Sequence, residues 1–272
     1  MASMPVGWSP RSFERRRKAF YRAVRDLKPV WLLEDMRAME TFYQEEDSGY
    51  RTYTPSEALL YAVVHDHRDY ARFLLSSYAA EALAEPGERV CRCAPSSHVA
   101  LAVRYDRRVI LELILRHRPA CSCADGGSTP LHLACELQRP DVVVMLLGHG
   151  VSPCVPDRDG RTPLDVILEE VRDSEEALGG HRRRCLDNLL MFMPKLEFKM
   201  KPALVLGPDS WTRVLGEDTF YYLVGRRPAP LVLAAMRTVV KQLSRETFTD
   251  SLYELPIPPS LKPADPRDRQ DQ

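Results

Sequence analysis

Two closely spaced cysteine pairs, Cys91 with Cys93 and Cys121 with Cys123, are the residues whose chemistry first suggests a metal site. Four thiolates brought together would bind zinc tetrahedrally. The usual spacing of zinc-binding cysteines is two to four residues, whereas a single residue separates the members of each pair here. The neighbouring arginine and proline side chains also do not supply the hydrogen bonds that orient metal ligands. We therefore predict free surface or packing cysteines, no metal and no cofactor, with a zinc site as the alternative.

Histidine side chains offer acid-base or metal-binding chemistry at two places. His65 and His67 flank an aspartate, but neighbours in sequence on a helix point in different directions, so we expect surface turn residues and no metal site. We expect His132 to make the hydrogen bonds that start a helix and not to act as a base. No phosphate-binding glycine loop, nucleophile elbow or metal-binding helix motif is present. The sequence therefore predicts a chain that is not an enzyme and has no catalytic residue.

The composition is that of a globular protein. With 272 residues, 44% apolar and 28% charged, the chain can bury a sizeable core. The 38 basic residues balance 38 acidic ones, so no global field favours nucleic acid or an anionic membrane as a partner. The seven cysteines do not form the dense framework of a secreted disulfide domain. No apolar run approaches the roughly 20 residues that span a bilayer, and no signal peptide is recognisable, so we expect a cytoplasmic protein without a membrane span.

An internal repeat provides the elements that position these residues. The run Thr-Pro-Leu-His-Leu-Ala at residues 129–134 recurs 33 residues later as Thr-Pro-Leu-Asp-Val-Ile at residues 162–167. Each copy follows a glycine-bearing turn, and its threonine can cap the helix that the proline opens. Residues 140–147 then read as a second helix that ends at glycine. This pattern resembles the ankyrin repeat, which predicts an all-α ankyrin-repeat solenoid.

Two weaker copies of the pattern lie earlier in the chain. Residues 97–102 match it 32 residues before the strong copy. Residues 59–62 match it at an offset of 72, which leaves room for an insertion of about seven residues around Cys91. A polar, glycine-containing segment at residues 173–181 reads as a second insertion. We therefore predict about four ankyrin repeats over residues 54–195, two of them with insertions.

The flanking segments are predicted to be mostly helical as well. Residues 13–39 carry apolar positions near helical spacing, broken at Pro29, which predicts two helices that cap the open end of the stack. The predicted organisation is thus a helical cap with a disordered start over residues 1–53, the repeats, a helical region over residues 196–262, and a disordered tail over residues 263–272.

The region after the repeats contains two further patterns. Residues 230–240 begin with proline and place Leu231, Ala235 and Val239 on one stripe of a helix, where the small Ala235 permits close approach by a partner. Residues 255–261 have three prolines in four positions, which is incompatible with a helix and predicts a stiff, extended segment.

These two patterns together resemble the SOCS box, a family in which the helix inserts its leucine into a pocket of elongin C and the proline segment contacts cullin 5. The resemblance implies two sets of binding residues. The elongin-binding set is Pro230, Leu231, Ala235 and Val239. The cullin-binding set is Leu255, Pro256, Ile257 and Pro258. The chain departs from the family at two places, with Ala235 where cysteine is usual and Pro263-Ala264 where Tyr-Leu commonly follows.

The order of parts over residues 18–262 is similar to the family of ankyrin repeat domain-containing protein 9. The likeness is carried by residues 30–37, 56–62, 99–105, 146–150 and 215–218. That family is described as a substrate receptor of cullin-RING ubiquitin ligases, with inosine-monophosphate dehydrogenase among the proteins it handles. The resemblance implies a chain that binds a target through its repeats, docks on elongin B/C and cullin 5 through its tail, and promotes ubiquitination and proteasomal degradation. The alternative is an interaction scaffold with no ligase role, in which residues 230–240 only cap the last repeat.

Overall fold

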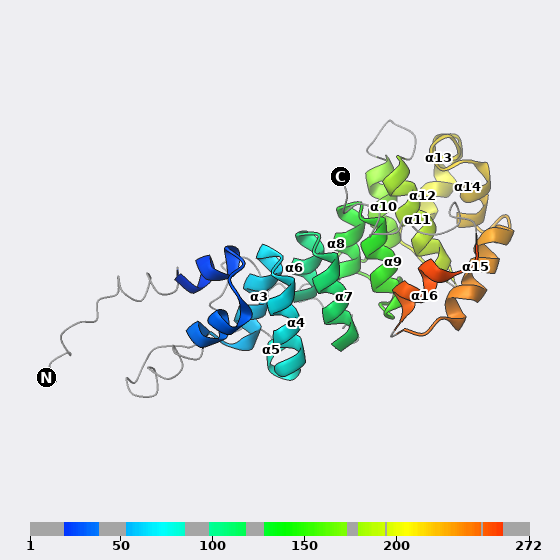
Figure 1. Cartoon of the computed structure of the whole chain (residues 1–272). Coiled ribbons are helices and arrows are strands. Elements are labelled where there is room, and N and C mark those ends of the chain that lie inside the picture. Colours follow the sequence, from blue (N-terminus) through cyan, green and yellow to red (C-terminus); the bar gives the residue numbers. More distant parts are fainter. Residues whose placement is uncertain are drawn as a thin grey trace, which may run out of the picture. The chain divides into compact units, whose positions relative to one another are not determined.

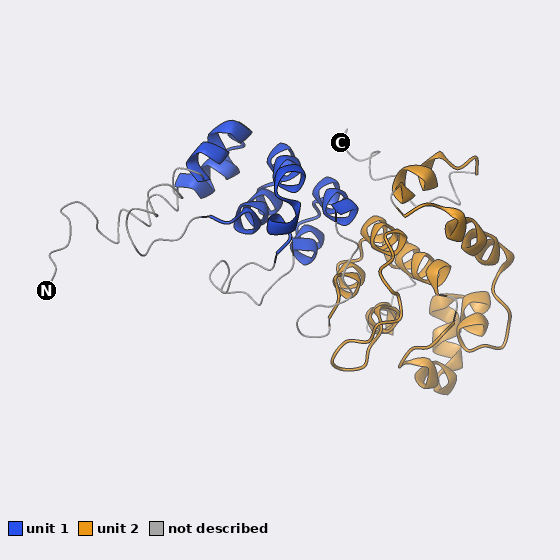
Figure 2. Ribbon diagram, turned by 90° about the horizontal axis from the view of Figure 1, so that it is seen from below, with its two compact units in different colours: residues 1–117 blue, residues 118–272 orange. Residues whose placement is uncertain are grey.

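The computed structural model describes residues 19–37, 53–84, 98–117, 128–172, 179–193, 195–245 and 247–257. Over these ranges every regular element is a helix, as the repeat pattern predicts (Figure 1). The chain divides into two compact units, residues 1–117 and residues 118–272 (Figure 2). Within the described ranges, no helix combines the length and the apolar content needed to cross a bilayer. The cysteine pairs Cys91–Cys93 and Cys121–Cys123, the position Pro258 and the predicted disordered tail lie outside the described residues.

The first unit consists of paired helices. After the helical residues 19–25 and 30–37 come α3 (Pro55–His65), α4 (Arg68–Ser77), the short α5 (Ala79–Ala82), α6 (His98–Arg104) and α7 (Arg108–His117). Helix α3 packs against α4 and α6 against α7, while α3 also contacts α6 and α4 contacts α7. Helices α4 and α7 each bury apolar side chains on one face, Leu74 and Leu75 in α4 and Ile110 and Ile114 in α7, and expose charged side chains on the other. This arrangement is that of stacked ankyrin repeats.

A left-handed residue recurs at the joint between the two helices of a pair. The residues concerned have φ between 51° and 57° and are Leu27, Asp66, Asp106 and Gln138. At each joint the next backbone N–H donates to the carbonyl oxygen of an alanine five residues earlier, at 2.9–3.0 Å. This hydrogen bond is the one that ends a helix in the Schellman motif. Because the joint at Leu27 has the same geometry as the other three, residues 19–37 form an ankyrin-like helix pair. The sequence pattern predicts these two helices and the break at Pro29, but not their likeness to a repeat.

The second unit begins with two further pairs, α8 (Pro130–Glu136) with α9 (Pro140–Gly148) and α10 (Pro163–Arg172) with α11 (Gly180–Phe192). Helix α8 packs on α10 and α9 packs on α11. In the described part of the remaining chain the helices are α12 (Lys201–Leu206), α13 (Pro208–Leu215), α14 (Glu217–Leu223), α15 (Leu231–Gln242) and α16 (Phe248–Glu254). Helix α16 is not indicated by the sequence pattern, which shows only a polar gap before the proline segment.

The two Thr-Pro-Leu runs start their helices through side-chain hydrogen bonds. Nδ1 of the fully buried His132 accepts from the Thr129 backbone N–H at 3.1 Å, and Nε2 donates to the Arg161 carbonyl oxygen at 2.9 Å. The prediction that His132 is a hydrogen-bonding residue of the helix start is therefore confirmed. In the second copy the equivalent residue is Asp165, and its carboxylate accepts from the backbone N–H groups of Thr162 at 2.8 Å and Met200 at 2.7 Å. The polar side chain of the first copy thus bonds to the next repeat, and that of the second copy bonds to the backbone at the start of α12.

Candidate functional site

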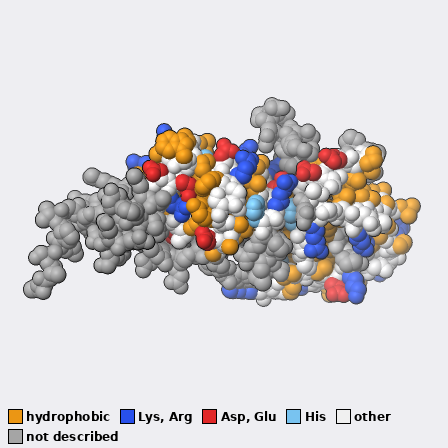
Figure 3. Space-filling view, turned by 60° about the horizontal axis from the view of Figure 1, so that its bottom comes forward, with side chains coloured by type: hydrophobic (Ala, Val, Ile, Leu, Met, Phe, Trp, Pro, Cys, Tyr) orange, Lys and Arg blue, Asp and Glu red, His pale blue; other side chains and the backbone are white. Residues whose placement is uncertain are grey.

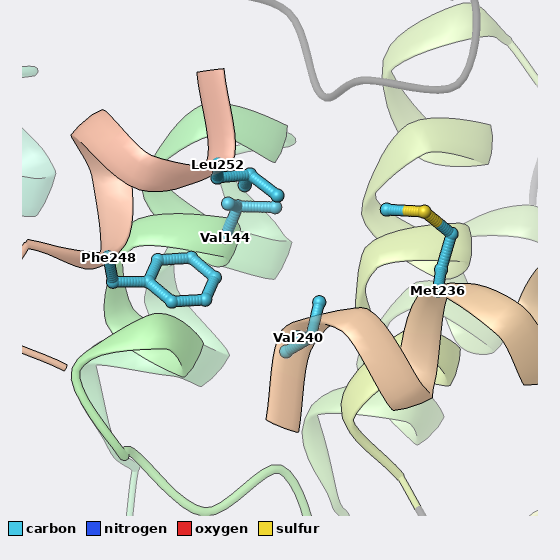
Figure 4. Close-up of a cluster of buried hydrophobic side chains, with 5 residues drawn as sticks. All are labelled: Val144, Met236, Val240, Phe248 and Leu252. Carbon is cyan, nitrogen blue, oxygen red and sulfur yellow. The ribbon is translucent and has the colours of Figure 1, made fainter. Parts of the chain in front are cut away.

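Helix α15 is the candidate docking element, and the chain forms it where the sequence predicts a helix. Pro230 is its N-cap residue, with φ −51° and ψ 143°, so the helix opens at Leu231 as the proline pattern implies. Met236 and Val240 are the residues of α15 that are buried. They join a cluster with Val144 of α9 and with Phe248 and Leu252 of α16 (Figure 4). One face of α15 is therefore held by the chain itself.

The predicted elongin-binding stripe lies on a different face of α15. Leu231 exposes 88% of its surface and its neighbour Val232 exposes 55%. Ala235 is also exposed, and Val239 is half-buried. In the space-filling view of Figure 3, hydrophobic side chains gather at the right-hand edge, where Figure 1 draws α14 and α15. The stripe is open at its amino-terminal end, where the leucine of the SOCS-box resemblance stands.

Arg237 fixes how α15 is rotated, a role that no local sequence pattern indicates. Its Nε and Nη2 atoms donate to the Leu190 carbonyl oxygen at 3.1 and 2.8 Å, and Nη2 also donates to the Met193 carbonyl oxygen at 2.6 Å. The same guanidinium contacts the Tyr222 hydroxyl. These carbonyls belong to the carboxyl end of α11, where backbone acceptors lack helical partners and a cation is favoured. Arg237 thus caps α11 and holds α15 so that Leu231 points away from the core.

The predicted cullin-binding segment differs from the expected extended form. The Ile257 backbone N–H donates to the Leu255 carbonyl oxygen at 2.8 Å, which makes a tight turn. Leu255 and Ile257 are half-buried against the cluster of α9, α15 and α16, while Pro256 is exposed. Leu255 and Ile257 pack against the chain's own core because they directly follow α16, whose buried side chains belong to the same cluster.

The two histidines beside Asp66 lie between α3 and α4: His65 is the last residue of α3, and His67 is the N-cap of α4. His65 is half-buried and His67 is buried, so the prediction of surface residues is wrong for His67. His67 is 6% exposed, its Nδ1 accepts from the Tyr70 backbone N–H at 3.3 Å, and its Nε2 donates to the Lys28 carbonyl oxygen at 2.8 Å. Its role is to cap α4 and to tie it to the helix pair before it. The described residues contain no group of three or more histidine, cysteine or acidic side chains placed to hold a metal.

The described cysteines are expected to differ widely in their reaction with iodoacetamide. Burial, assisted by the charge of Asp141, raises the pKa of Cys185 to about 12, and burial also raises the pKa of Cys135 well above its ordinary value. A pKa of about 12 leaves roughly one thiol in 10,000 ionised at pH 8. Cys154 is only partly buried. Peptide mapping after brief alkylation at pH 8 should therefore find Cys154 modified, with Cys135 and Cys185 modified only in urea. Rapid native modification of Cys185 would contradict this burial.

Comparison with known proteins agrees with the repeat geometry. Residues 113–167 match the family model described as ankyrin repeats (many copies). Ankyrin repeat domain-containing protein 9 of Mus musculus is 41% identical over 288 residues, which cover 91% of this chain and 88% of that protein. Two shorter similarities cover small parts of other proteins. Neurogenic locus notch homolog protein 4 of Homo sapiens is 37% identical over 70 residues, 25% of this chain and 4% of that protein. BTB/POZ domain and ankyrin repeat-containing protein NBCL of Lotus japonicus is 51% identical over 42 residues, 15% of this chain and 9% of that protein.

Proposed function

The chain belongs to the family of ankyrin repeat domain-containing protein 9, and we propose that it is a substrate receptor of a cullin-RING ubiquitin ligase. Ankyrin repeats are protein-interaction modules, and the repeats would hold a target protein, with inosine-monophosphate dehydrogenase as the candidate that the family likeness suggests. The tail would dock on elongin B/C and cullin 5 in the cytoplasm. The chain forms and breaks no bond in this role and is not an enzyme.

A single observation carries the proposal: Leu231 is 88% exposed on a helix whose opposite side is firmly packed. Burying a leucine side chain stabilises a protein by about 1.5–3 kcal/mol, and α15 does not use Leu231 for that purpose. A lone exposed leucine is ordinary on a protein surface. Here, however, it stands beside the exposed Val232 and on one stripe with Ala235, a small residue that leaves room for a partner. This combination favours an intermolecular role for the stripe over a capping role.

The proposed action is to raise the local concentration of a target near the ubiquitin-transfer machinery. A protein that binds two partners at once converts their encounter into an intramolecular event, with effective concentrations in the millimolar range for short connections. The receptor thereby promotes ubiquitination and proteasomal degradation of whatever its repeats hold. Specificity would come from the side chains that the repeats present, and adaptor docking from α15.

Leu231→Ser is expected to weaken the binding of elongin B/C about 30-fold while leaving the fold intact. Removing the leucine from an apolar pocket costs about 2 kcal/mol, which is about 30-fold in affinity. Because Leu231 is exposed, the free energy of unfolding should change by no more than about 0.5 kcal/mol. Pull-down with purified elongin B/C and urea unfolding monitored by circular dichroism measure the two effects.

Lys241→Ser is the matched control, because Lys241 is exposed on α15 but lies off the stripe. It should bind elongin B/C as the unsubstituted chain does. Met236→Ser should show the reverse pattern to Leu231→Ser, since Met236 is 6% exposed and supports the core: we expect lower stability by about 2–4 kcal/mol. If the Leu231→Ser chain retains elongin, or if the unsubstituted chain does not bind it, the scaffold alternative is the better account.

A further inference from the structure

Helix α9 lacks a solvent face. All nine of its residues, Pro140–Gly148, are buried, and after Asp141 it has no charged side chain. The corresponding outer helices of the first unit are different, because α4 exposes Arg68, Asp69 and Arg72, and α7 exposes Arg116. A helix that is apolar on all sides must be covered on all sides. Helices α8 and α11 cover part of α9, so another element must cover the rest.

Helix α16 is that element, and it sits on α9 at a position that only glycine permits. A Cβ atom on Gly148 would lie 2.0 Å from Cδ1 and 2.3 Å from Cε1 of Phe248, far inside van der Waals contact. Gly148 is the last residue of α9 and is not among the positive-φ glycines, so its role here is to leave space and not to adopt an unusual backbone. In this contact with α9, Phe248 is 2% exposed and Leu252 is fully buried. The ring of Phe192 in α11 lies 5.8 Å from that of Phe248.

The side chains that α16 packs against α9 also hold the carboxyl end of α15. Val240, in the last turn of α15, packs in one cluster with Phe248 and Leu252, and Leu243 packs against that cluster (Figure 4). Only residues 243–247 separate α15 from α16, so a firmly seated α16 restrains the end of α15. The middle of α15 is fixed separately by Arg237 on α11. Two attachments along one helix define its direction as well as its position.

From this geometry we propose that α16 is a strut: Phe248 seated on Gly148 fixes the direction of α15 relative to the repeats α8–α11, so that the adaptor bound to α15 is held in one orientation to the target. The inference rests on the proposed function for its consequence, but the strut itself is a property of the free chain. Orientation matters for ubiquitin transfer because a flexible attachment lets the reacting groups occupy a larger volume, which lowers their effective concentration. Gly148 and Phe248 are therefore positioning residues.

The test measures the direction of α15 by pulsed electron spin resonance. Spin labels are introduced as unnatural amino acids at Arg158 and Lys241, both exposed, which leaves the seven cysteines unchanged. The unsubstituted chain should give one narrow distance distribution, free or bound to elongin B/C. Gly148→Ala and Phe248→Ala should each broaden it by at least about twofold, because α15 can then swing about its Arg237 attachment. Elongin B/C should bind both variants within about twofold of the unsubstituted chain.

Gly180→Ala is the matched control. Gly180 is also a helical glycine, but among the described residues no atom outside its own helical turn lies within 4 Å of an added Cβ, so the distribution should stay narrow. The double variant Gly148→Ala with Phe248→Ala should be no broader than Phe248→Ala alone, since removal of the ring removes the clash. A narrow distribution in Phe248→Ala, or additive broadening in the double variant, would overturn the strut. Because the free chain is measured as well, this outcome is separate from a failure of elongin binding.

Discussion

Truncation after Arg245 is expected to turn the second unit into an aggregating species that binds hydrophobic dyes. The deletion removes Phe248 and Leu252, each of which contributes roughly 2–5 kcal/mol when buried, and it uncovers Val144 on α9. The total loss is comparable with the entire free energy of unfolding of a domain, about 5–15 kcal/mol. The exposed apolar face of α9 then has no charged side chain to keep it in water. Size-exclusion chromatography and 8-anilinonaphthalene-1-sulfonate fluorescence measure the outcome.

Truncation after Lys262 is the control, since it removes only residues 263–272, which the sequence predicts to be disordered. That chain should elute as the full-length protein does. Elution of the chain truncated after Arg245 at the volume of a folded monomer, with no dye binding, would show that α16 is dispensable. The prediction also has a practical consequence: loss of elongin on deletion of the whole tail would report unfolding as much as lost docking. The substitution Leu231→Ser separates the two effects, and the deletion does not.

The repeats could be predicted from sequence because their determinants are local. A threonine, a proline and a polar residue within four positions define a helix start, and a period of 33 residues repeats it. The structure places Thr129 and His132 in the hydrogen bonds that this pattern requires. The stripe of Leu231, Ala235 and Val239 could be predicted from sequence as well, since residues four apart share a helix face. What could not be read was which faces of α15 the chain itself covers.

The missed features depend on contacts between distant parts of the sequence. Arg237 donates hydrogen bonds to backbone carbonyls 44 and 47 residues away. Because every residue has a backbone carbonyl, the residue types do not show which ones accept. The packing of α16 on α9 could not be predicted for the same reason. The uncharged stretch at residues 142–148 does indicate that this helix is buried on all sides. The first helix pair had a signal too, because Ala23-Val24 repeats the Ala62-Val63 and Ala102-Val103 that precede the later joints. Those dipeptides are too short to be distinguished from chance without the left-handed joint that follows them.

Asp165→Ala is expected to destabilise the second unit by about 3–5 kcal/mol, although Asp165 contacts no partner in the proposed function. The carboxylate is fully buried and accepts from the backbone N–H groups of Thr162, Lys199 and Met200 at 2.7–3.0 Å, as well as from the Thr162 hydroxyl. Alanine leaves these donors buried without an acceptor, and each such group costs about 1–3 kcal/mol. Urea unfolding should show the loss. Asp159→Ala in the preceding loop is the control, since the Asp159 side chain is 72% exposed, and should change stability by no more than about 0.5 kcal/mol.

Asp165→His tests the same buried donors in another way, because it would restore the Thr-Pro-Leu-His run of the first copy. In that copy His132 faces a carbonyl oxygen, to which its Nε2 can donate. Asp165 instead faces the N–H groups of Lys199 and Met200, and a neutral imidazole has a single acceptor, already required for the helix start. We therefore expect Asp165→His to be about as unstable as Asp165→Ala. Recovery of stability by histidine would mean that the repeat motif itself, and not the donors at the start of α12, selects the residue at position 165.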